Sequence, residues 1–350
     1  GLVAMFWYGA QTYAASTAVA LLITALTGNP GTEMFLGMTG VMWVSFIFVS
    51  AFQVYLFWQG IDLVRKFLNF AGPAVYVVMI ILMIAIWAEV GGSLLSEVGN
   101  IFSSGTRSGG FEGLGSFGAF LAVFSIMVGY FAAVVINFGD FARFVKNEEE
   151  MKKGNLYGLV GNVIFFSFIT LMITGGTIAL FGEYVSQPTD MVAKVDNIFL
   201  TIVAAFAFFA ATVGINMVAN FIPPAYDLAN LMPSKINFRT GGLITAAFGF
   251  VIGGMWVAVI TKMGIFPFVN TLGAILAPVF GIMITDYYII KKQKIDVNAL
   301  FNEGKGKYWY NDGFNLKGMV AWILSGYIAI GSVWPNILPG GLGDFFANLG

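Results

Sequence analysis

Long apolar stretches separated by short polar segments dominate the pattern along the chain. Nine of them are almost free of charge, and each has close to the roughly 20 residues that an α-helix needs to cross about 30 Å of hydrocarbon. The stretches cover approximately 2–27, 35–59, 67–88, 117–138, 156–182, 197–221, 240–261, 265–290 and 318–338. The pattern predicts an all-α polytopic membrane protein with about nine transmembrane helices in a lipid bilayer.

The composition strengthens this interpretation and removes several functions. Hydrophobic residues make up 58% of the chain and charged residues 10%, and the mean hydropathy is +0.84, which does not suit a soluble globule. The absence of Cys and His excludes disulfides, thiol chemistry and imidazole ligands for a metal. No phosphate-binding loop or metal-ligand cluster is visible either. We therefore expect no enzyme, no cofactor, no bound metal and no nucleic-acid partner.

The distribution of Lys and Arg predicts the orientation. When nine helices are threaded back and forth across the bilayer, one set of loops holds 14 of the 17 basic residues. The other set holds only Arg107, Lys194 and Lys262. Since loops rich in Lys and Arg normally face the cytoplasm, residue 1 is expected on the cytoplasmic side of the cell membrane.

Uncharged amides inside the apolar stretches are the first candidates for chemistry. A buried amide without a hydrogen-bond partner costs roughly 2 to 7 kcal/mol, so each must bond a neighbouring helix or a ligand. These amides are Gln11, Asn162, Asn216, Asn220 and Asn270. Trp7 and Gln11 are four residues apart and share one helix face, which suits a flat polar heterocycle. An interfacial tryptophan and amides that pack between helices are the alternative interpretation.

Two further stretches contain candidate irregularities. Gly129, followed by Tyr130 and Phe131, marks a candidate break where unwound backbone lines a cavity, although glycine is also common in continuous membrane helices. Asn270 follows Pro267, which frees a backbone carbonyl, so this amide either contacts a substrate or stabilises a kink. All 18 acidic residues fall in loops or near helix ends, so no ionisable group is expected at depth.

Four blocks of the sequence resemble the nucleobase:cation symporter-1 family, in particular its bacterial hydantoin and allantoin carriers. The blocks are FWYGAQT at 6–12, VGYFAAVVINFGDFARFVK at 128–146, ANFIPPAYDLANLMPSKINFRTGG at 219–242 and NTLGAILAPVFGIMITDYYIIKKQKIDVNALF at 270–301. The third and fourth blocks are specific, and with the helices between them the resemblance covers nearly the whole chain. It implies a LeuT-like inverted-repeat fold with twelve helices.

Under this resemblance, residues 1–350 form a single transmembrane transporter domain. The domain is expected to begin at the third family helix and to end after the eleventh. The first two helices would then be missing at the N-terminus, and the C-terminus would also be incomplete. A start at the third helix agrees with a cytoplasmic residue 1. We further expect the protein to work as a monomer.

The resemblance also assigns candidate site residues. The family's stacking tryptophan matches Trp7, and the amide one turn later matches Gln11. The second stacking aromatic, usually Trp, falls on Phe131, and the substrate-bonding asparagine falls on Asn220. A planar ring is then expected between Trp7 and Phe131, with Gln11 and Asn220 bonding its NH and C=O groups. The remaining substrate-binding candidates are Tyr130, Val269 and Asn270, while Asn216 is left open and Asn162 is assigned to helix packing.

The ion-binding positions depart from the family pattern. Sodium-coupled members use a Ser-Thr pair on the eighth family helix, because a hard cation requires oxygen ligands. The aligned residues in this chain are Gly214 and Ile215. Backbone carbonyls, for instance that of Ala211, are then the ligands left on this helix. The coupling cation is accordingly expected to be either Na⁺ or H⁺.

The combined expectation is a secondary active transporter that imports a small neutral heterocycle by cation symport with alternating access. The candidate substrates are nucleobases and related cyclic amides: uracil, cytosine, purine, allantoin or hydantoin. A LeuT-like symporter for amino acids or other small solutes is the alternative, and competition by zwitterions distinguishes it. A receptor or channel is a second alternative, which would bind its ligand without accumulating it.

Overall fold

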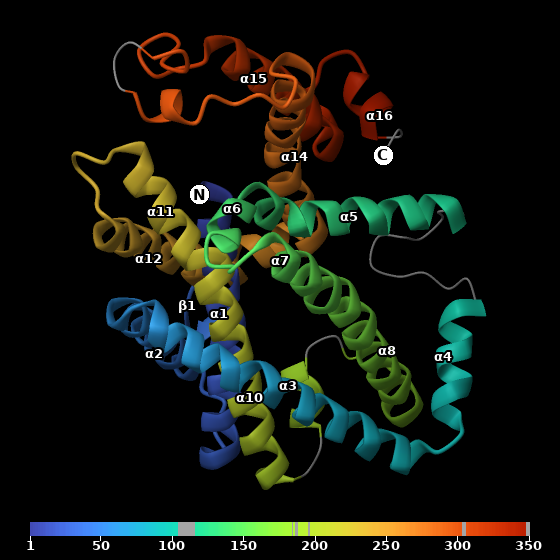
Figure 1. Cartoon of the computed structure of the whole chain (residues 1–350). Coiled ribbons are helices and arrows are strands. Elements are labelled where there is room, and N and C mark those ends of the chain that lie inside the picture. The colour runs from blue at the N-terminus through green and yellow to red at the C-terminus, as the bar shows by residue number, and fades with distance from the viewer. Residues whose placement is uncertain (104–115, 184, 186–187, 195–196, 303–305, 348–350) are drawn as a thin grey trace. The chain divides into compact units, whose positions relative to one another are not determined.

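The computed structural model of the chain describes residues 1–103, 116–183, 185, 188–194, 197–302 and 306–347. Helices make up nearly all of the regular structure (Figure 1). The chain separates into two compact units: unit 1 contains Gly1–Thr106 and Asp140–Lys262, and unit 2 contains Arg107–Gly139 and Met263–Gly350. Arg107, one of the three basic residues assigned to the second set of loops, lies outside the described residues.

Unit 1 contains most of the helices. Its elements are α1 (Leu2–Thr27), β1 (Glu33–Phe35), β2 (Met38–Thr39), α2 (Gly40–Gln59), α3 (Ile61–Val90), α4 (Ser93–Ser103), α7 (Glu148–Asn155), η1 (Leu156–Gly161), α8 (Asn162–Phe181), α9 (Pro188–Ala193), α10 (Ile198–Asn216), η2 (Met217–Phe221), α11 (Ile222–Leu231), α12 (Phe238–Gly254), η3 (Trp256–Ile260) and α13 (Thr261–Met263). Unit 2 contains α5 (Ser116–Ile136), α14 (Ile265–Ile284), η4 (Thr285–Ile290), η5 (Asn298–Phe301), α15 (Leu316–Val333), η6 (Pro335–Ile337) and α16 (Leu342–Ala347). The short α6 (Phe138–Ala142) crosses one boundary between the units, and α13 crosses the other, since its last residue belongs to unit 2.

The predicted membrane spans are confirmed. Within the described chain, eight helices are long and apolar enough to cross a membrane. A ninth is added if α12 and the η3–α13 segment, bent by 52° from each other, count as one span. Three spans are longer than predicted, covering Asp62–Val90, Glu148–Phe181 and Ile198–Leu231. In all three, the additional turns carry charged or polar residues, which hydrophobicity alone places outside a helix.

The predicted start of the second helix, at residue 35, is wrong for the segment 35–39. This segment belongs to the antiparallel hairpin of β1 and β2 and not to the helix predicted over 35–59. The turn needs positive φ angles at Leu36 (50°) and Gly37 (77°), which an α-helix does not contain. α2 begins after Thr39, whose hydroxyl accepts a hydrogen bond from the Met42 N–H at 3.2 Å.

α1 occupies a central position in unit 1, where α2, α10 and α12 pack around it (Figure 1). Its contact with α12 depends on glycine. A Cβ atom on Gly9 would lie 2.7 Å from the Gly249 carbonyl oxygen and 2.9 Å from the Gly253 nitrogen. Because these distances leave no room for a side chain, the two helices meet at the level of the backbone. This contact fixes the helix that carries Trp7 and Gln11.

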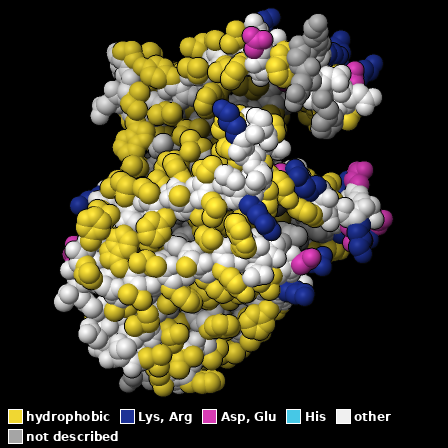
Figure 2. All heavy atoms as spheres, turned by 90° about the vertical axis from the view of Figure 1, so that its left-hand side faces the viewer, with side chains coloured by type: hydrophobic (Ala, Val, Ile, Leu, Met, Phe, Trp, Pro, Cys, Tyr) yellow, Lys and Arg dark blue, Asp and Glu magenta, His cyan; other side chains and the backbone are white. Residues whose placement is uncertain are grey.

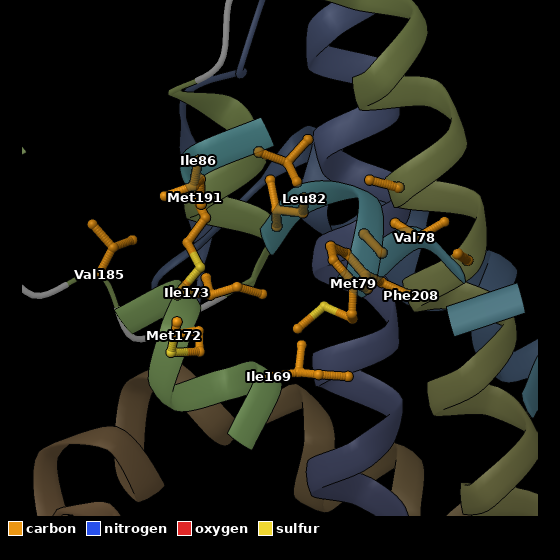
Figure 3. Close-up of a cluster of buried hydrophobic side chains, with 14 of the residues drawn as sticks. Val78, Met79, Leu82, Ile86, Ile169, Met172, Ile173, Val185, Met191 and Phe208 are labelled. Atoms are coloured by element: carbon orange, nitrogen blue, oxygen red, sulfur yellow. The ribbon is translucent and has the colours of Figure 1, made fainter. Parts of the chain in front are cut away.

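Two clusters of buried apolar side chains hold unit 1 together. The first joins α3, α8, α9 and α10 and is shown in Figure 3, with Leu82 and Ile173 among its members. In the second, the Tyr8 ring of α1 stacks on Phe221 of η2 with 4.7 Å between centroids, and Phe57 of α2 meets Phe221 edge-on. Each buried ring of this size contributes about 1.5–3 kcal/mol of hydrophobic stabilisation. The second cluster therefore holds α1, α2 and η2 in one fixed arrangement.

Large apolar side chains also cover much of the outer surface (Figure 2). Exposed examples in unit 1 are Phe48 on α2, Ile81 on α3, Phe165 on α8 and Phe206 on α10. Soluble proteins rarely expose apolar surface on this scale. The surface suits the acyl chains of a bilayer, in agreement with the hydropathy of the spans.

Unit 2 is built on the close pair of α5 and α14. A Cβ atom on Gly273 would lie 2.8 Å from the Gly129 Cα atom, so these helices also meet at backbone level. α5 runs through Gly129 without interruption, and the candidate break at this residue is wrong. The glycine serves close helix packing instead. α15 joins the pair through Trp334, whose Nε1 donates to the Thr271 hydroxyl at 2.8 Å.

Candidate functional site

Trp7 and Gln11 lie one turn apart on α1, as predicted from their spacing. The Trp7 side chain is buried and Gln11 is half-buried. The amide of Gln11 makes no side-chain hydrogen bond with the other described residues. Its donor and its acceptor therefore remain available to a ligand, which is what the predicted role requires.

A buried group of polar side chains begins at the next residue of α1 and joins it to α2 and α10. Thr12 Oγ1 accepts hydrogen bonds from Gln53 Nε2 at 2.9 Å and from Asn216 Nδ2 at 3.2 Å. Asn216 Nδ2 also donates to Gln53 Oε1 at 2.8 Å and to the Tyr8 carbonyl oxygen at 3.1 Å. Thr12, Gln53 and Asn216 are at most 1% exposed. Because the three side chains satisfy one another, the group is stable inside an apolar interior.

Asn220 extends this polar group by one step. Its Nδ2 donates to the Asn216 Oδ1 at 3.0 Å, and the residue is 8% exposed. Its carbonyl oxygen accepts no hydrogen bond from any other residue that the structure describes. An acceptor left in this position inside an apolar interior favours a bond to a ligand. The structure thus gives Asn220 both an anchor and an open acceptor.

The backbone around Asn220 departs from a regular α-helix for a reason that the sequence contains. The two prolines at 223–224 have no N–H, so the carbonyls at 219–220 lose their α-helical donors. The turn before them, η2, is π-helical, and its closing backbone hydrogen bond spans five residues instead of four. π-helical turns within longer helices are frequent at functional sites. The prolines therefore account for the local geometry that presents Asn220.

The structure separates the candidate amides by role. Asn216, left open by the sequence, packs between helices, because its Nδ2 bonds residues of α1 and α2, while its Oδ1 accepts from Asn220 one turn further along. Asn162 accepts a hydrogen bond from the Tyr76 hydroxyl of α3, in agreement with its predicted packing role. Gln53 is absent from the candidates that the sequence suggested, although it too is an amide inside an apolar stretch. Its position inside an apolar stretch is the sequence signal that could have identified Gln53 as a candidate.

Unit 2 brings its own candidates together on α5 and α14. The rings of Tyr130 and Phe131 meet edge-on, with centroids 5.1 Å apart. Val269 is buried where α14 meets α5, and Asn270 follows it in a half-buried position. The predicted ring sandwich takes Trp7 from unit 1 and Phe131 from unit 2, and it stays a prediction.

The aligned ion positions on α10 offer no side-chain oxygen. Gly214 is buried against α3, where an added Cβ atom would lie 2.8 Å from the Leu68 Cδ2 atom. The Ile215 side chain is 54% exposed, and Ala211 is half-buried. A cation bound to this helix would thus need backbone carbonyls. The ion site also stays a prediction.

A charged cluster joins the region of α6 to α11. The Arg143 guanidinium bonds the Asp140 carboxylate at 2.8 Å and lies 4.8 Å from the centre of the Tyr226 ring. Burial raises the pKa of Asp140, and the charge of Asp227 raises that pKa further. The cluster anchors the chain after α6 to α11. It belongs to the set of loops for which the sequence predicts the cytoplasmic side.

The fold and these contacts define an α-helical membrane protein whose polar interior in unit 1 is built from neutral amides and hydroxyls. The model of the family described as permeases for cytosine/purines, uracil, thiamine and allantoin matches residues 1–343, and the chain belongs to this family. Its members are transporters and not enzymes. The family predicted from the four sequence blocks is confirmed.

Relatives in the family come from bacteria and plants. The chain is 32% identical to an allantoin permease of Bacillus subtilis over 96% of its own length and 67% of the relative. It is 27% identical to the purine-uracil permease NCS1 of Arabidopsis thaliana (94% and 54%) and 27% identical to a hydantoin permease of Microbacterium maritypicum (96% and 65%). The chain thus spans about half to two thirds of the length of these relatives.

Two solved structures of Mhp1 share the fold. The inward-facing conformation of Mhp1 has a TM-score of 0.66 and 23% identity, covering 99% of this chain and 73% of Mhp1. The closed conformation with bromovinylhydantoin bound has a TM-score of 0.64 and 22% identity, covering 99% and 78%. The latter is described as a nucleobase-cation-symport-1 family transporter. The predicted LeuT-like, all-α transporter fold is confirmed.

Proposed function

We propose that the protein imports a neutral planar heterocycle, a nucleobase or a related cyclic amide, by cation symport with alternating access. The observation that carries this proposal is Asn220, an anchored amide whose carbonyl oxygen is left as an acceptor within an uncharged, buried polar group. A neutral NH-bearing ring satisfies such a group, whereas a charged solute would need an opposite charge beside it. The names of the relatives, which include allantoin, hydantoin and purine-uracil permeases, support the same class of substrate.

The proposed binding mode uses residues of both units. The ring stacks between Trp7 and Phe131, while Gln11 and Asn220 bond its NH and C=O groups. Val269 supplies an apolar contact, and Tyr130 and Asn270 border the ring. Stacking binds any flat ring, so the amides determine which one is accepted. Allantoin and hydantoin, which carry several adjacent NH and C=O groups, suit this arrangement.

A cation gradient provides the free energy for uptake in this proposal. One charge moving down a membrane potential releases about 2.3 kcal/mol per 100 mV. The cation is Na⁺ or H⁺, and on α10 it would be bound by backbone carbonyls such as that of Ala211. Uptake driven separately by a sodium gradient and by a pH gradient distinguishes the two cations.

The proposed setting is the cell membrane, with residue 1 on the cytoplasmic side. The 14 basic residues in one set of loops support this orientation. We also propose that the two units belong to one transporter domain that works as a monomer. A cysteine introduced at Lys152, an exposed position of the charged helix α7, should react with a membrane-impermeant thiol reagent only from the cytoplasmic side. Labelling from outside in intact cells would reverse the orientation.

Uptake into proteoliposomes tests the proposed function. The full-length protein is reconstituted, and uptake of radiolabelled uracil, cytosine, allantoin and hydantoin is compared under an imposed cation gradient. Accumulation of at least one ring against its gradient is the expected result. A folded protein that accumulates none of them contradicts the proposal. Inhibition by zwitterionic amino acids, instead of by nucleobases, would favour an amino-acid symporter.

A further inference from the structure

The hydrogen bonds of the buried polar group in unit 1 run in one direction from donor to acceptor, and a backbone carbonyl determines that direction. The Tyr8 carbonyl oxygen can only accept hydrogen bonds. The Thr12 hydroxyl donates its single hydrogen to this oxygen at 2.7 Å. Thr12 Oγ1 has no further hydrogen to give, so towards every other neighbour it can only accept.

Both amides that meet Thr12 must therefore turn their NH₂ groups towards it. Gln53 presents Nε2 at 2.9 Å and Asn216 presents Nδ2 at 3.2 Å. Asn216 Nδ2 also faces two further acceptors, the Tyr8 carbonyl and Gln53 Oε1. If either amide were reversed, its carbonyl oxygen would face an oxygen that has no hydrogen to share. The loss of such a buried hydrogen bond costs about 1–3 kcal/mol.

The orientation of Asn216 then determines that of Asn220. With its NH₂ group committed to Thr12, Asn216 offers only Oδ1 to Asn220, which must respond with Nδ2, at 3.0 Å. Water offers little alternative, because Thr12, Gln53 and Asn216 are at most 1% exposed. Asn220 keeps Oδ1 and one N–H for a ligand. A free asparagine could turn either end to a substrate, but this one cannot.

We propose that Thr12, Gln53 and Asn216 are positioning residues that fix the Asn220 carboxamide with its oxygen as the acceptor for substrate, so that the transporter requires an N–H donor on the ring at this point. The inference rests on the proposed function, in which Asn220 contacts the substrate. Substrate selectivity then depends on residues that do not themselves touch the ring. A site built around one fixed acceptor rejects a ring without the matching N–H, because its own polar group is left unpaired.

N-methylated substrates measure this selectivity directly. Uptake of the best transported ring is compared with uptake of analogues methylated at each ring nitrogen in turn, for example uracil with 1-methyluracil and 3-methyluracil. For the wild-type protein, methylation at one nitrogen is expected to raise KM by about 10- to 100-fold. Equal KM values for the parent ring and all its methylated analogues would overturn the inference.

Thr12→Val keeps the shape of the side chain and removes the acceptor of Gln53 Nε2 and one of the three acceptors that face Asn216 Nδ2. The ratio of KM between the methylated analogue and the parent ring is expected to fall at least about threefold, because the preference of the amides for one orientation is weakened while the Tyr8 carbonyl and Gln53 Oε1 still face Asn216 Nδ2. Thr12→Ser retains the oxygen and should restore the wild-type ratio. A steric effect of the methyl group alone would leave the ratio unchanged in Thr12→Val, and this result would overturn the inference.

Ser16→Ala is the matched control. Ser16 is also buried on α1, but its hydroxyl donates to the Thr12 carbonyl at 2.6 Å and makes no hydrogen bond with the two amides. Removal of the Ser16 hydroxyl should leave the KM ratio within about twofold of the wild type, since the Thr12 carbonyl keeps its backbone hydrogen bond within α1. A ratio that falls equally in Ser16→Ala and Thr12→Val would show a general loosening of α1 and would also overturn the inference.

Gln53→Met provides a second variant in case Thr12→Val does not fold. It removes one donor to Thr12 and one acceptor of Asn216 and leaves Thr12 as the anchor, so the ratio should fall by only about two- to threefold. Folding of each variant is checked by size-exclusion chromatography in detergent. If the wild-type protein transports no heterocycle, the proposed function fails and the inference fails with it. If the wild type discriminates but the folded variants keep its ratio, only the inference fails.

Discussion

Two asparagines in the two units show different ways to carry an amide within a membrane span. Asn216 of unit 1 is fully buried and bonded to side chains of α1 and α2. Asn270 of unit 2 is half-buried and makes no side-chain hydrogen bond with the other described residues, on a helix pair that meets through glycines. The comparison indicates that unit 1 supplies fixed hydrogen-bonding directions, whereas unit 2 supplies a surface of rings and apolar groups.

The largest effect is expected from Asn220→Ala, which removes the open acceptor from unit 1. Uptake, measured as kcat/KM in proteoliposomes, should fall by about 100-fold or more, because the substrate loses a buried hydrogen bond and its orientation together. Asn162→Ala is the matched control, since Asn162 bonds only Tyr76 among the described residues and should keep uptake within about threefold. Unchanged uptake by Asn220→Ala would remove this residue from the site.

The glycine contacts should respond alike in both units. Gly253→Ala in unit 1 places a Cβ atom 2.7 Å from the Gly9 carbonyl oxygen, and Gly273→Ala in unit 2 places one 2.8 Å from the Gly129 Cα atom. Each is expected to lower the free energy of unfolding by about 1–3 kcal/mol. Thermal unfolding in detergent measures the change.

Gly281→Ala provides the reference for these two variants. It lies on α14, and no atom comes within 4 Å of its added Cβ. Since alanine favours a helix over glycine by about 0.5–1 kcal/mol, Gly281→Ala should be neutral or stabilising. Equal destabilisation by all three substitutions would show that close backbone contact is not the cause.

Removal of the ring in unit 2 should have a moderate effect on affinity and little effect on selectivity for N–H groups. Phe131→Leu loses the stacking face, and KM should rise about three- to tenfold for every planar substrate alike. Phe131→Trp retains that face and is the control. If Phe131→Leu changes the ratio between a ring and its N-methylated analogue, unit 2 takes part in reading hydrogen-bond direction and the distinction between the units is wrong.

The smallest effect concerns an ion pair at the end of η4. Lys291 donates to Asp286 at 2.5 Å, and this hydrogen bond raises the pKa of Lys291. The pair stabilises the fold at pH values below the ordinary lysine pKa of about 10.4, and the stabilisation is lost as the pH rises through the higher pKa of the folded state. The contribution should be below about 1 kcal/mol, because both groups are partly exposed.

Lys291→Met tests this pair. At pH 7 its midpoint of thermal unfolding should lie slightly below that of the wild type, and the two midpoints should converge above about pH 11. Lys292→Met is the control, because Lys292 makes no ion pair among the described residues. A difference between Lys291→Met and the wild type that persists at high pH would assign the effect to packing.

The spans could be predicted from the sequence because hydrophobic length is a local property. The same reasoning fails at 35–39, where apolar residues form a hairpin whose turn depends on positive φ at Leu36 and Gly37. The same reasoning also omits α7 from the span, because this charged segment continues the helix through backbone hydrogen bonds that do not depend on hydrophobicity. Hydrophobicity records where a chain meets lipid and gives little information about where a helix ends.

The candidate site could be predicted only as far as residue type. Asn216 and Asn220 are both amides in one apolar stretch, and their spacing does not distinguish a packing residue from a ligand. The distinction comes from Gln53, which lies 163 residues from Asn216 in the chain. Its side-chain oxygen accepts a hydrogen bond from the Asn216 amide and so engages that amide in packing. Such tertiary contacts have no local pattern in the sequence. The ring sandwich and the ion site remain predictions for experiment.

The proline pair at 223–224 has a consequence for genetics. Because it removes the α-helical donors of the carbonyls at 219–220, part of the polarity near Asn220 belongs to the main chain. A scan that replaces one side chain after another keeps every one of these oxygens in place. A map of tolerated mutations would therefore understate what this turn contributes, and its importance would appear at the two prolines, which are not among the candidate substrate-binding residues.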